Sequence, residues 1–299
     1  MKASFIVPSF QQGHYLSQCL DSIMAQGLDR KEYEVLVYDG GSTDQTQTIL
    51  KNHPLNPVWI SGLDGGQANA VNLGMREARG AIIAWINSDD YYLPDAINTI
   101  IQHFENAPKT RIIYGNAIRV DTNGDKIMDY PIEDWNYRRL LEKCYLCQPA
   151  TFFRKEILQD HGFLNENFHL ALDLEFWLRI GKYEDFLRVH DSFAAAREYS
   201  TNKSQSYPLR MQIEALWAGY IHTGKLSAKR LWSISENLVF IQDPQLKKSL
   251  DANPKSPWKN GLFWTSKILR FAIIKLRIQQ KEFPWHWLDF GNPIHEMEI

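Results

Sequence analysis

Short apolar stretches alternate with amphipathic stretches through the first third of the chain. Each apolar stretch is rich in β-branched or aromatic residues and is followed by Gly, Ser, Asp or Asn and then by a helical pattern, which predicts a repeated strand–helix unit. The expected strands are Ser4–Val7, Glu34–Tyr38, Val58–Ile60 and Ala81–Ile86, and the expected helices are His14–Ala25, Asp44–Asn52, Gln67–Ala78 and Pro94–Glu105. Such repeats form α/β folds, here a Rossmann-like, mostly parallel sheet with helices on both faces.

The pattern changes after residue 110. Arg111–Val120 and Lys126–Tyr130 flank an Asn123-Gly124 pair, which predicts a β-hairpin. Gln148–Phe153 is expected to form a further strand, and Leu172–Gly181 an amphipathic helix that closes the domain. We therefore expect a catalytic domain over residues 1–205 and a helical C-terminal accessory region over residues 206–299.

Composition narrows the class of protein. The chain has 299 residues and a formal charge of -2, and this near balance argues against nucleic-acid binding through the overall field. Three cysteines make no disulfide framework and suit a reducing compartment, so a cytoplasmic location is expected. We find neither a secretory signal nor a run of about 18 apolar residues, so any membrane contact is expected to be peripheral.

Three loops carry the candidate chemistry, and each follows a predicted strand. They are Asp39–Asp44, Asp64–Asn69 and Asn87–Asp90. The carboxyl ends of parallel strands meet at one edge of a sheet, where such folds bind ligands. Taken singly, the first two loops are explained by a turn and a helix cap, but three similar loops at corresponding strand ends are far less easily a coincidence.

The adjacent carboxylates of Asp89 and Asp90 allow two interpretations. They repel each other, and a shared Mg²⁺ or Mn²⁺ would relieve the repulsion, since these ions often take one or two carboxylates plus phosphate oxygens. An aspartate-rich start of the following helix explains the same residues. The hexapeptide that ends in Asp90 does not by itself decide between them.

Together these stretches resemble the family 2 glycosyltransferases of the GT-A fold. The resemblance covers residues 3 to about 205 and rests on the order and spacing of six stretches: Ile6–Phe10, Asp39–Asp44, Asp64–Asn72, Trp85–Asp90 with Leu93-Pro94, Gln148–Arg154 and Asp173–Arg179. It implies an inverting, metal-dependent enzyme of the hexosyltransferase type that uses a nucleotide-diphosphate-sugar donor. We expect the donor to be a UDP-sugar. The residues implied to bind the donor are Pro8, Ser9, Phe10, Asp39, Asp64, Gly66, Asn69, Asn87 and Ser88.

The resemblance also assigns the metal and the base. It implies a Mn²⁺ or Mg²⁺ held by Asp89, with Asp90 either assisting or only fixing the loop; Asn87 stands where relatives more often carry a first aspartate, so coordination from there is weaker or indirect. Asp173 falls at the position of the base that deprotonates the acceptor hydroxyl, and Glu175 is the weaker candidate. A capping or salt-bridged carboxylate is the alternative for Asp173.

Several neighbouring residues keep open alternatives. Phe176 and Trp177 fit a core better than an acceptor groove, and Gln148 either contacts the transferred sugar or starts a strand. Where many relatives carry Arg-x-His, this chain reads Arg197-Glu198-Tyr199, so the resemblance does not carry over the histidine contact. Arg197 or Lys203 could supply positive charge to the leaving group, although a solvated loop charge is the commoner fate of either. The pair Cys144 and Cys147 lacks the further ligands that a zinc site needs.

The C-terminal region is basic. Residues 247–281 contain nine basic side chains and one acid, with apolar and aromatic residues between them. Such a segment fits either peripheral membrane contact, which we place at residues 259–287, or a helix docked on the protein with a solvated basic face.

The expected reaction is sugar transfer to the hydroxyl of a glycan or lipid-linked glycan. The expected pathway is bacterial polysaccharide or lipopolysaccharide assembly, in the cytoplasm or at the inner face of the membrane. The alternatives are a sugar-nucleotidyltransferase, whose usual Gly-rich, basic signature is absent from Pro8–Tyr15, and a non-catalytic nucleotide-sugar-binding module. The transferred sugar, the linkage and the oligomeric state do not follow from the sequence.

Overall fold

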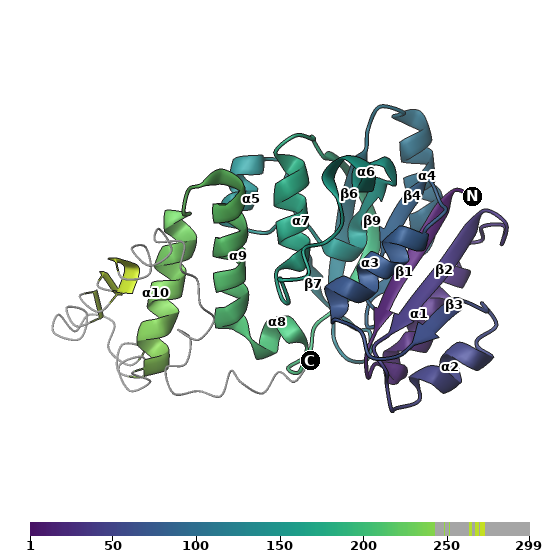
Figure 1. Cartoon of the computed structure of the whole chain (residues 1–299), viewed down its shortest axis with the longest axis horizontal. Coiled ribbons are helices and arrows are strands. Elements are labelled where there is room, and N and C mark those ends of the chain that lie inside the picture. Colours follow the sequence, from purple (N-terminus) through teal and green to yellow (C-terminus); the bar gives the residue numbers. More distant parts are fainter. Residues whose placement is uncertain (243–247, 249–250, 252–262, 265–266, 269, 273–299) are drawn as a thin grey trace. The chain divides into compact units, whose positions relative to one another are not determined.

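The computed structural model describes residues 1–242, 248, 251, 263–264, 267–268 and 270–272 (Figure 1). The chain divides into two compact units. The first comprises residues 1–140 and 144–206, and the second comprises residues 141–143 and the chain from residue 207.

A nine-stranded mixed sheet forms the centre of the first unit. Its order is β3-β2-β1-β4-β8-β6-β9-β5, with β7 paired to β6. Strands β3, β2, β1 and β4 are parallel, whereas β8 runs antiparallel to both β4 and β6. The strands are β1 (Ala3–Ser9), β2 (Tyr33–Asp39), β3 (Val58–Ser61), β4 (Ile82–Trp85), β5 (Tyr91–Tyr92), β6 (Ile112–Val120), β7 (Lys126–Asp129), β8 (Thr151–Arg154) and β9 (Leu187–Arg197).

Helices cover both faces of this sheet, as the alternation of side chains along β1 shows. Phe5 and Val7 belong to a core cluster with side chains of α1 (Gly13–Met24), α2 (Thr46–Asn52) and α4 (Ala96–Asn106). Ile6 points the opposite way, toward α3 (Gln67–Glu77), where a Cβ on Gly74 would lie 2.5 Å from the Ile6 Cγ2 atom. Because every residue of β1 is buried, the strand reads as a continuous apolar run.

The second face continues onto α7 (Leu172–Gly181). Phe153 of β8 contacts the ring of Phe176 at 5.6 Å and that of Trp177 at 6.0 Å between centroids. Both aromatic side chains of α7 are fully buried, so the core interpretation of this pair is confirmed. The α/β fold class with helices on both faces is likewise confirmed.

The second half of the sheet departs in part from the expectations. The hairpin is confirmed, with Gly124 in a left-handed conformation (φ +92°) at its turn. Gln148–Ala150 forms a short 3₁₀ helix before β8, so the expected strand starts too early. Strands β5 and β9 were not expected, because β9 holds its place through long-range pairing with β6 and its Ala194–Ala196 run carries little local strand signal. Short helices of this unit are α6 (Glu156–His161) and α8 (Lys203–Ser206). The helix α5 (Tyr137–Glu142) begins in the first unit, and its last two residues belong to the second.

The second unit contains α9 (Pro208–Thr223) and α10 (Ala228–Gln242), whose apolar side chains pack together. Within the basic segment, the described Lys267 side chain is only 3% exposed; it pairs with Glu236 and lies 4.5 Å over the ring of Trp232. Lys267 is therefore not part of a solvated basic face. Most of the expected membrane segment lies outside the described residues, and among the described helices none is long and apolar enough to cross a bilayer.

Candidate active site

The parallel strands β1, β2 and β3 end side by side and carry the first part of the site. In the strand register, Ser9 pairs with Asp39 and Asp39 with Ser61. Beyond the ladder, the Gly40 amide donates to the Ser9 carbonyl at 2.9 Å and the Gly62 amide to the Asp39 carbonyl at 3.0 Å. The loops that follow these strands therefore begin from one rigid edge.

Asp39 holds this edge together through its own carboxylate. The side chain is 2% exposed, and Oδ1 accepts a 2.5 Å hydrogen bond from the Ser42 hydroxyl. Oδ2 accepts from the Ser42 amide at 3.0 Å and from the Ser61 hydroxyl at 2.5 Å. A carboxylate offers about four acceptor positions, so Asp39 keeps little capacity for a ligand. Its main role is to hold the two loops that carry Ser42 and Ser61.

Phe10, Gly40 and Asp64 adjoin one another beyond that edge. A Cβ on Gly40 would lie 3.2 Å from the Phe10 ring and 3.4 Å from the Asp64 carboxylate, so glycine keeps this space open. The Phe10 side chain is 60% exposed. Gly66 has φ +95°, a conformation that favours glycine, and its amide donates to Asp64 Oδ1 at 2.9 Å just before α3 begins. This geometry leaves an exposed aromatic ring beside a partly buried carboxylate.

Pro8 and Ser9 are buried at the end of β1. The Ser9 hydroxyl has no hydrogen-bond partner among the described residues. A buried polar group without a partner is costly and is uncommon in native proteins. An unsatisfied hydroxyl at the expected nucleoside site is thus a feature that a bound ligand would relieve.

Asp89 lies in the loop after β4 and is partly exposed. Its Oδ2 accepts a 2.8 Å hydrogen bond from the Tyr199 hydroxyl, which in turn accepts from the Gln12 side-chain amide at 3.0 Å. Tyr199 therefore stands at the position where many relatives carry a histidine, and its hydroxyl contacts Asp89, the candidate metal ligand.

Asp90 is buried, and Arg197 fixes it. The Arg197 amide donates to Asp90 Oδ1 at 2.9 Å, while its guanidinium donates to the Asp89 carbonyl at 2.9 Å and to Gln18 Oε1 at 2.6 Å. Arg197 is 5% exposed and lies 4.3 Å over the ring of Tyr15. The expectation of a solvated charge at Arg197 was wrong, because β9 brings it beneath the acidic loop.

The electrostatics of this loop fit a divalent cation. Burial raises the pKa of Asp89, although the hydrogen bond from Tyr199 lowers it. Burial and the neighbouring charge of Asp89 raise the pKa of Asp90 well above its usual range. Two neighbouring carboxylates whose pKa values are raised by burial are unfavourable in the charged form unless a cation compensates them. The described residues hold no group of three or more His, Cys, Asp or Glu side chains suited to a metal.

Asn87 lies at the centre of an amide network in the same loop. Its contacts join α3, the end of β4 and the 3₁₀ helix, and all four partners are side chains: Gln67, Trp85, Asp90 and Gln148. The neighbouring Ser88 is buried. Gln148 is also buried. It lies in the short 3₁₀ helix and therefore does not start a strand.

Asp173 lies in the first turn of α7 and is partly exposed. Burial of the carboxyl group raises its pKa to about 6, although the Leu174 amide donates to Oδ1 at 2.7 Å. Burial raises the pKa of Cys147, and the charges of Asp90 and Asp173 raise it further.

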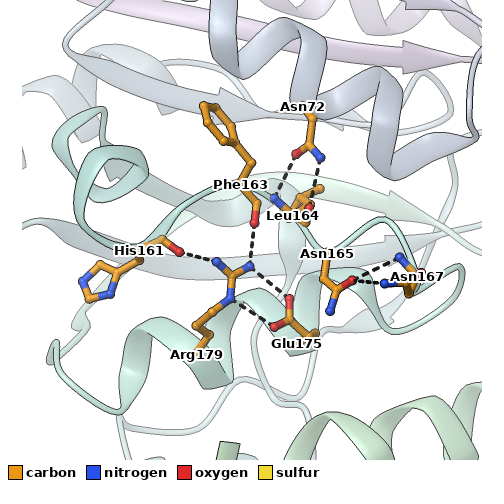
Figure 2. A network of polar contacts seen from close by, with 8 residues as sticks. All are labelled: Asn72, His161, Phe163, Leu164, Asn165, Asn167, Glu175 and Arg179. Atoms are coloured by element: carbon orange, nitrogen blue, oxygen red, sulfur yellow. Dashed lines mark hydrogen bonds and ion pairs between the residues drawn. The ribbon is translucent and has the colours of Figure 1, made fainter. Parts of the chain in front are cut away.

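A polar network fixes the loop that leads into α7 (Figure 2). The buried Asn72 side chain of α3 donates to the Leu164 carbonyl at 3.0 Å and accepts from the Leu164 amide at 2.8 Å. Arg179 donates to the His161 and Phe163 carbonyls and forms an ion pair with Glu175. The paired Glu175 carboxylate is 1% exposed, which makes it a structural group rather than a base.

Asn69, expected to bind the donor, is turned toward that loop. Its side-chain amide donates to Glu166 Oε2 at 3.2 Å, and Asn72 donates to Glu166 Oε1 at 2.8 Å. Lys203 lies close to the start of α3, with its Nζ atom 3.5 Å from Gln67 Oε1. Four further residues had no role assigned from the sequence: Gln67 and Asn72 lie within the Asp64–Asn72 stretch, whereas Gln12 and Glu166 belong to none of the six stretches. Only their contacts reveal these roles.

Among the described residues, neither Cys144 nor Cys147 forms a disulfide. Cys147 is buried, and burial raises its pKa well above the usual range. A protonated, buried thiol is inert, which agrees with a structural rather than a metal or redox role.

The fold and the acidic loops at the strand ends define a GT-A-type α/β enzyme, and comparison with known proteins places it in a family. The sequence pattern of the family described as Glycosyl transferase family 2 matches residues 4–162, which is more than half of the chain. The chain therefore belongs to glycosyltransferase family 2.

Individual relatives agree with this assignment. Poly(ribitol-phosphate) β-N-acetylglucosaminyltransferase TarS of Staphylococcus aureus is 26% identical over 232 residues, which cover 74% of this chain and 38% of TarS. The structure of TarS 1–349 in complex with UDP-GlcNAc superimposes with a TM-score of 0.63 at 18% identity, covering 95% of this chain and 93% of that one. A mannosyltransferase from Pyrobaculum calidifontis in complex with GDP-Man and Mn²⁺ gives a TM-score of 0.59 at 15% identity, with 92% and 87% covered.

Proposed function

We propose that this chain is an inverting, metal-dependent glycosyltransferase that transfers a sugar from a nucleotide-diphosphate donor, UDP-linked, to an acceptor hydroxyl. The observation that carries the proposal is the loop after β4, in which Asp89 Oδ2 accepts from the Tyr199 hydroxyl at 2.8 Å and the buried Asp90 accepts from the Arg197 amide at 2.9 Å. A site with raised carboxyl pKa values is suited both to cation binding and to proton transfer. The family and the TarS complex with UDP-GlcNAc support the choice of donor.

The first three strand ends bind the nucleoside in this proposal. The exposed Phe10 ring offers a face for the base, and Asp64 accepts hydrogen bonds from donors of the base or the ribose. The buried Ser9 hydroxyl gains the partner that it lacks. Asp39 acts mainly through Ser42 and Ser61 by fixing the loops, while Pro8, Gly66, Asn69 and Ser88 shape the backbone around the donor.

Asp89 is the residue that would hold a Mn²⁺ or Mg²⁺, with the buried Asp90 adding negative charge behind it. When bound, the cation supplies charge stabilisation for the departing diphosphate. The Tyr199 hydroxyl orients the Asp89 carboxylate by holding Oδ2, and the complex of the Pyrobaculum mannosyltransferase with Mn²⁺ supports a divalent ion in this fold.

Asp173 accepts the proton of the acceptor hydroxyl. With a pKa of about 6, about nine-tenths of the groups are ionised at pH 7, and the base is stronger than an ordinary aspartate. The Asn72–Leu164 contacts and the Glu175–Arg179 pair keep the start of α7 in place for this role. A single displacement by the activated hydroxyl inverts the anomeric centre.

The acceptor is a glycan or lipid-linked glycan in this proposal, and the pathway is bacterial polysaccharide or lipopolysaccharide assembly. The similarity to TarS, named for transfer onto poly(ribitol-phosphate), supports a polymeric acceptor. We place the reaction in the cytoplasm or at the inner face of the membrane, with peripheral contact through residues 259–287.

The experiment is a panel of nucleotide-sugars offered to the purified protein with glycan acceptors, with Mn²⁺ or with a chelator, while free nucleoside diphosphate is measured. We expect turnover with one UDP-sugar and loss of that turnover when the metal is chelated. NMR should show that the anomeric centre of the product is inverted. In Asp173→Asn the turnover should fall by about 10²–10⁴-fold. Asp160→Asn, an exposed change, serves as the matched control.

Each alternative has its own outcome. Release of pyrophosphate from a nucleoside triphosphate would establish a sugar-nucleotidyltransferase instead. Tight UDP binding with no turnover on any acceptor would indicate a binding module. Unchanged turnover in Asp173→Asn would remove Asp173 from the mechanism.

A further inference from the structure

The side chain of Asn87 uses its whole hydrogen-bonding capacity inside the protein. Oδ1 accepts from Gln67 Nε2 at 2.8 Å and from the indole Nε1 of Trp85 at 3.2 Å. Nδ2 donates to Gln148 Oε1 at 3.2 Å and to Asp90 Oδ2 at 3.4 Å. An asparagine side chain has two acceptor positions and two donor hydrogens, so all four are engaged.

Two groups of Trp85 fix the orientation of the Asn87 and Gln148 side-chain amides, because one can only donate and the other can only accept a hydrogen bond. An indole N–H only donates, so the atom of Asn87 that faces Trp85 must be oxygen. A backbone carbonyl only accepts, so the Gln148 atom that lies 2.5 Å from the Trp85 carbonyl must be nitrogen. The remaining Gln148 oxygen then faces Asn87, which must present its nitrogen there. Oxygen and nitrogen of an amide are assigned from such networks, and here the network leaves a single assignment.

We propose that Asn87 is a positioning residue for the donor site and not a ligand of the cation: its amide joins Gln67 at the start of α3, the acidic loop at Asp90, and Gln148. The connection spans residues 20 and 61 positions away in the chain. It sets the start of α3 relative to the acidic loop before any ligand arrives. Its meaning for donor binding rests on the proposed function; the amide junction itself does not.

A carboxylate cannot make the same contacts. Asp at position 87 would turn one oxygen toward Gln148 Oε1 and the Asp90 carboxylate, so two donor contacts become two repulsive ones. Gln148 cannot relieve this by rotating its amide, because its oxygen would then face the Trp85 carbonyl. The asparagine that departs from the acidic pattern is thus required by its neighbours.

The test compares Asn87→Asp with wild type in the full chain, with Asn123→Asp as a matched change in the exposed turn between β6 and β7, where Asp-Gly is as suitable as Asn-Gly. Without metal or nucleotide, we expect the melting temperature of Asn87→Asp to fall by roughly 3–8 °C and that of Asn123→Asp to change by about 1 °C or less. By calorimetry with UDP present, the Mn²⁺ affinity of Asn87→Asp does not rise. An unchanged melting temperature together with Mn²⁺ affinity about tenfold higher would overturn the proposal, because Asn87 would then be a ligand position.

A double-mutant cycle separates the junction from general destabilisation. Because Asn87 and Gln148 share a contact, the melting-temperature losses of Asn87→Ala and Gln148→Ala should not add in the double variant. Additive losses would contradict the junction. If wild type binds neither UDP nor Mn²⁺, the proposed function fails, whereas both thermal measurements still decide the role of Asn87.

Discussion

The loop after β2 and the loop after β4 both place aspartate at a strand end, yet the two carboxylate sites differ. Asp39 is surrounded by neutral donors: the Ser42 amide and hydroxyl and the Ser61 hydroxyl all bind its oxygens. Asp89 and Asp90 have each other as neighbours, and burial raises the pKa of both. Neutral donors satisfy Asp39, whereas Asp89 and Asp90 keep raised pKa values despite donors of their own from Tyr199, Asn87 and the Arg197 amide.

The difference separates a scaffold from a reactive site. A buried carboxylate with several donors stabilises its loop, whereas the charged form of two neighbouring, desolvated carboxylates is unfavourable until a cation binds. Replacement of the charge should therefore have opposite effects on stability at the two loops. This contrast is directly measurable.

The largest effect is expected at the β4 loop. Asp89→Asn removes the charge that would hold the metal, so turnover should fall by about 10³-fold or more. The melting temperature in the absence of metal should rise, because the charge that raises the pKa of Asp90 is removed. Nucleoside diphosphate release and thermal unfolding measure the two effects. An unaltered turnover would show that Asp89 is not the metal ligand, and the exposed Asp29→Asn is the control.

The second effect concerns pH. Since burial raises the pKa of Asp173 to about 6, turnover should fall about tenfold per pH unit below pH 6 and level off above it. The folded protein binds the Asp173 proton more tightly than the unfolded chain, so this group lowers stability as pH rises from about 4 to about 6.

Asp173→Asn removes that penalty. At pH 7.5 we expect its free energy of unfolding to exceed that of wild type by about 1–2 kcal/mol, after allowance for the partly exposed side chain. The difference should vanish below about pH 4. Thermal unfolding of both proteins across pH measures it, and equal stability at pH 7.5 would mean that the carboxyl group is not desolvated.

A smaller effect is expected at the β2 loop, with the opposite sign for stability. Asp39→Asn keeps one acceptor oxygen but loses contacts to Ser42 or Ser61, so the free energy of unfolding should fall by about 2 kcal/mol. UDP affinity should fall about 10-fold through displacement of the loops. Calorimetric titration and denaturant unfolding measure these changes. A rise in stability would remove the contrast between the loops.

The smallest effect is expected at Tyr199, which touches the site only through Asp89. Tyr199→Phe removes the hydroxyl that holds Oδ2, and loss of such an outer contact should weaken Mn²⁺ binding by about 10-fold. The exposed Tyr183→Phe is the matched control. Unchanged Mn²⁺ affinity would show that Tyr199 does not orient the ligand.

Most of the first half of the fold could be predicted from local patterns. The predicted strands Ser4–Val7 and Ala81–Ile86 coincide with β1 and β4 to within a few residues. These strands are recognisable as apolar runs because both of their faces are covered. The hairpin turn at Gly124 followed from its residue pair. Strand β9 was missed because its stability comes from pairing with β6, about 75 positions earlier in the chain.

The sequence by itself determined which side chains follow which strands, and so that Asp39, Asp64 and Asp89 would lie at one edge of a parallel sheet. Only the tertiary structure decided how each carboxylate is used. Arg197 reaches Asp90 across 107 positions and Tyr199 reaches Asp89 across 110. Local patterns report the burial and periodicity of a segment; hydrogen-bond partners so distant along the chain depend on how strands and helices pack, which sets the charge and the exposure of every acidic group.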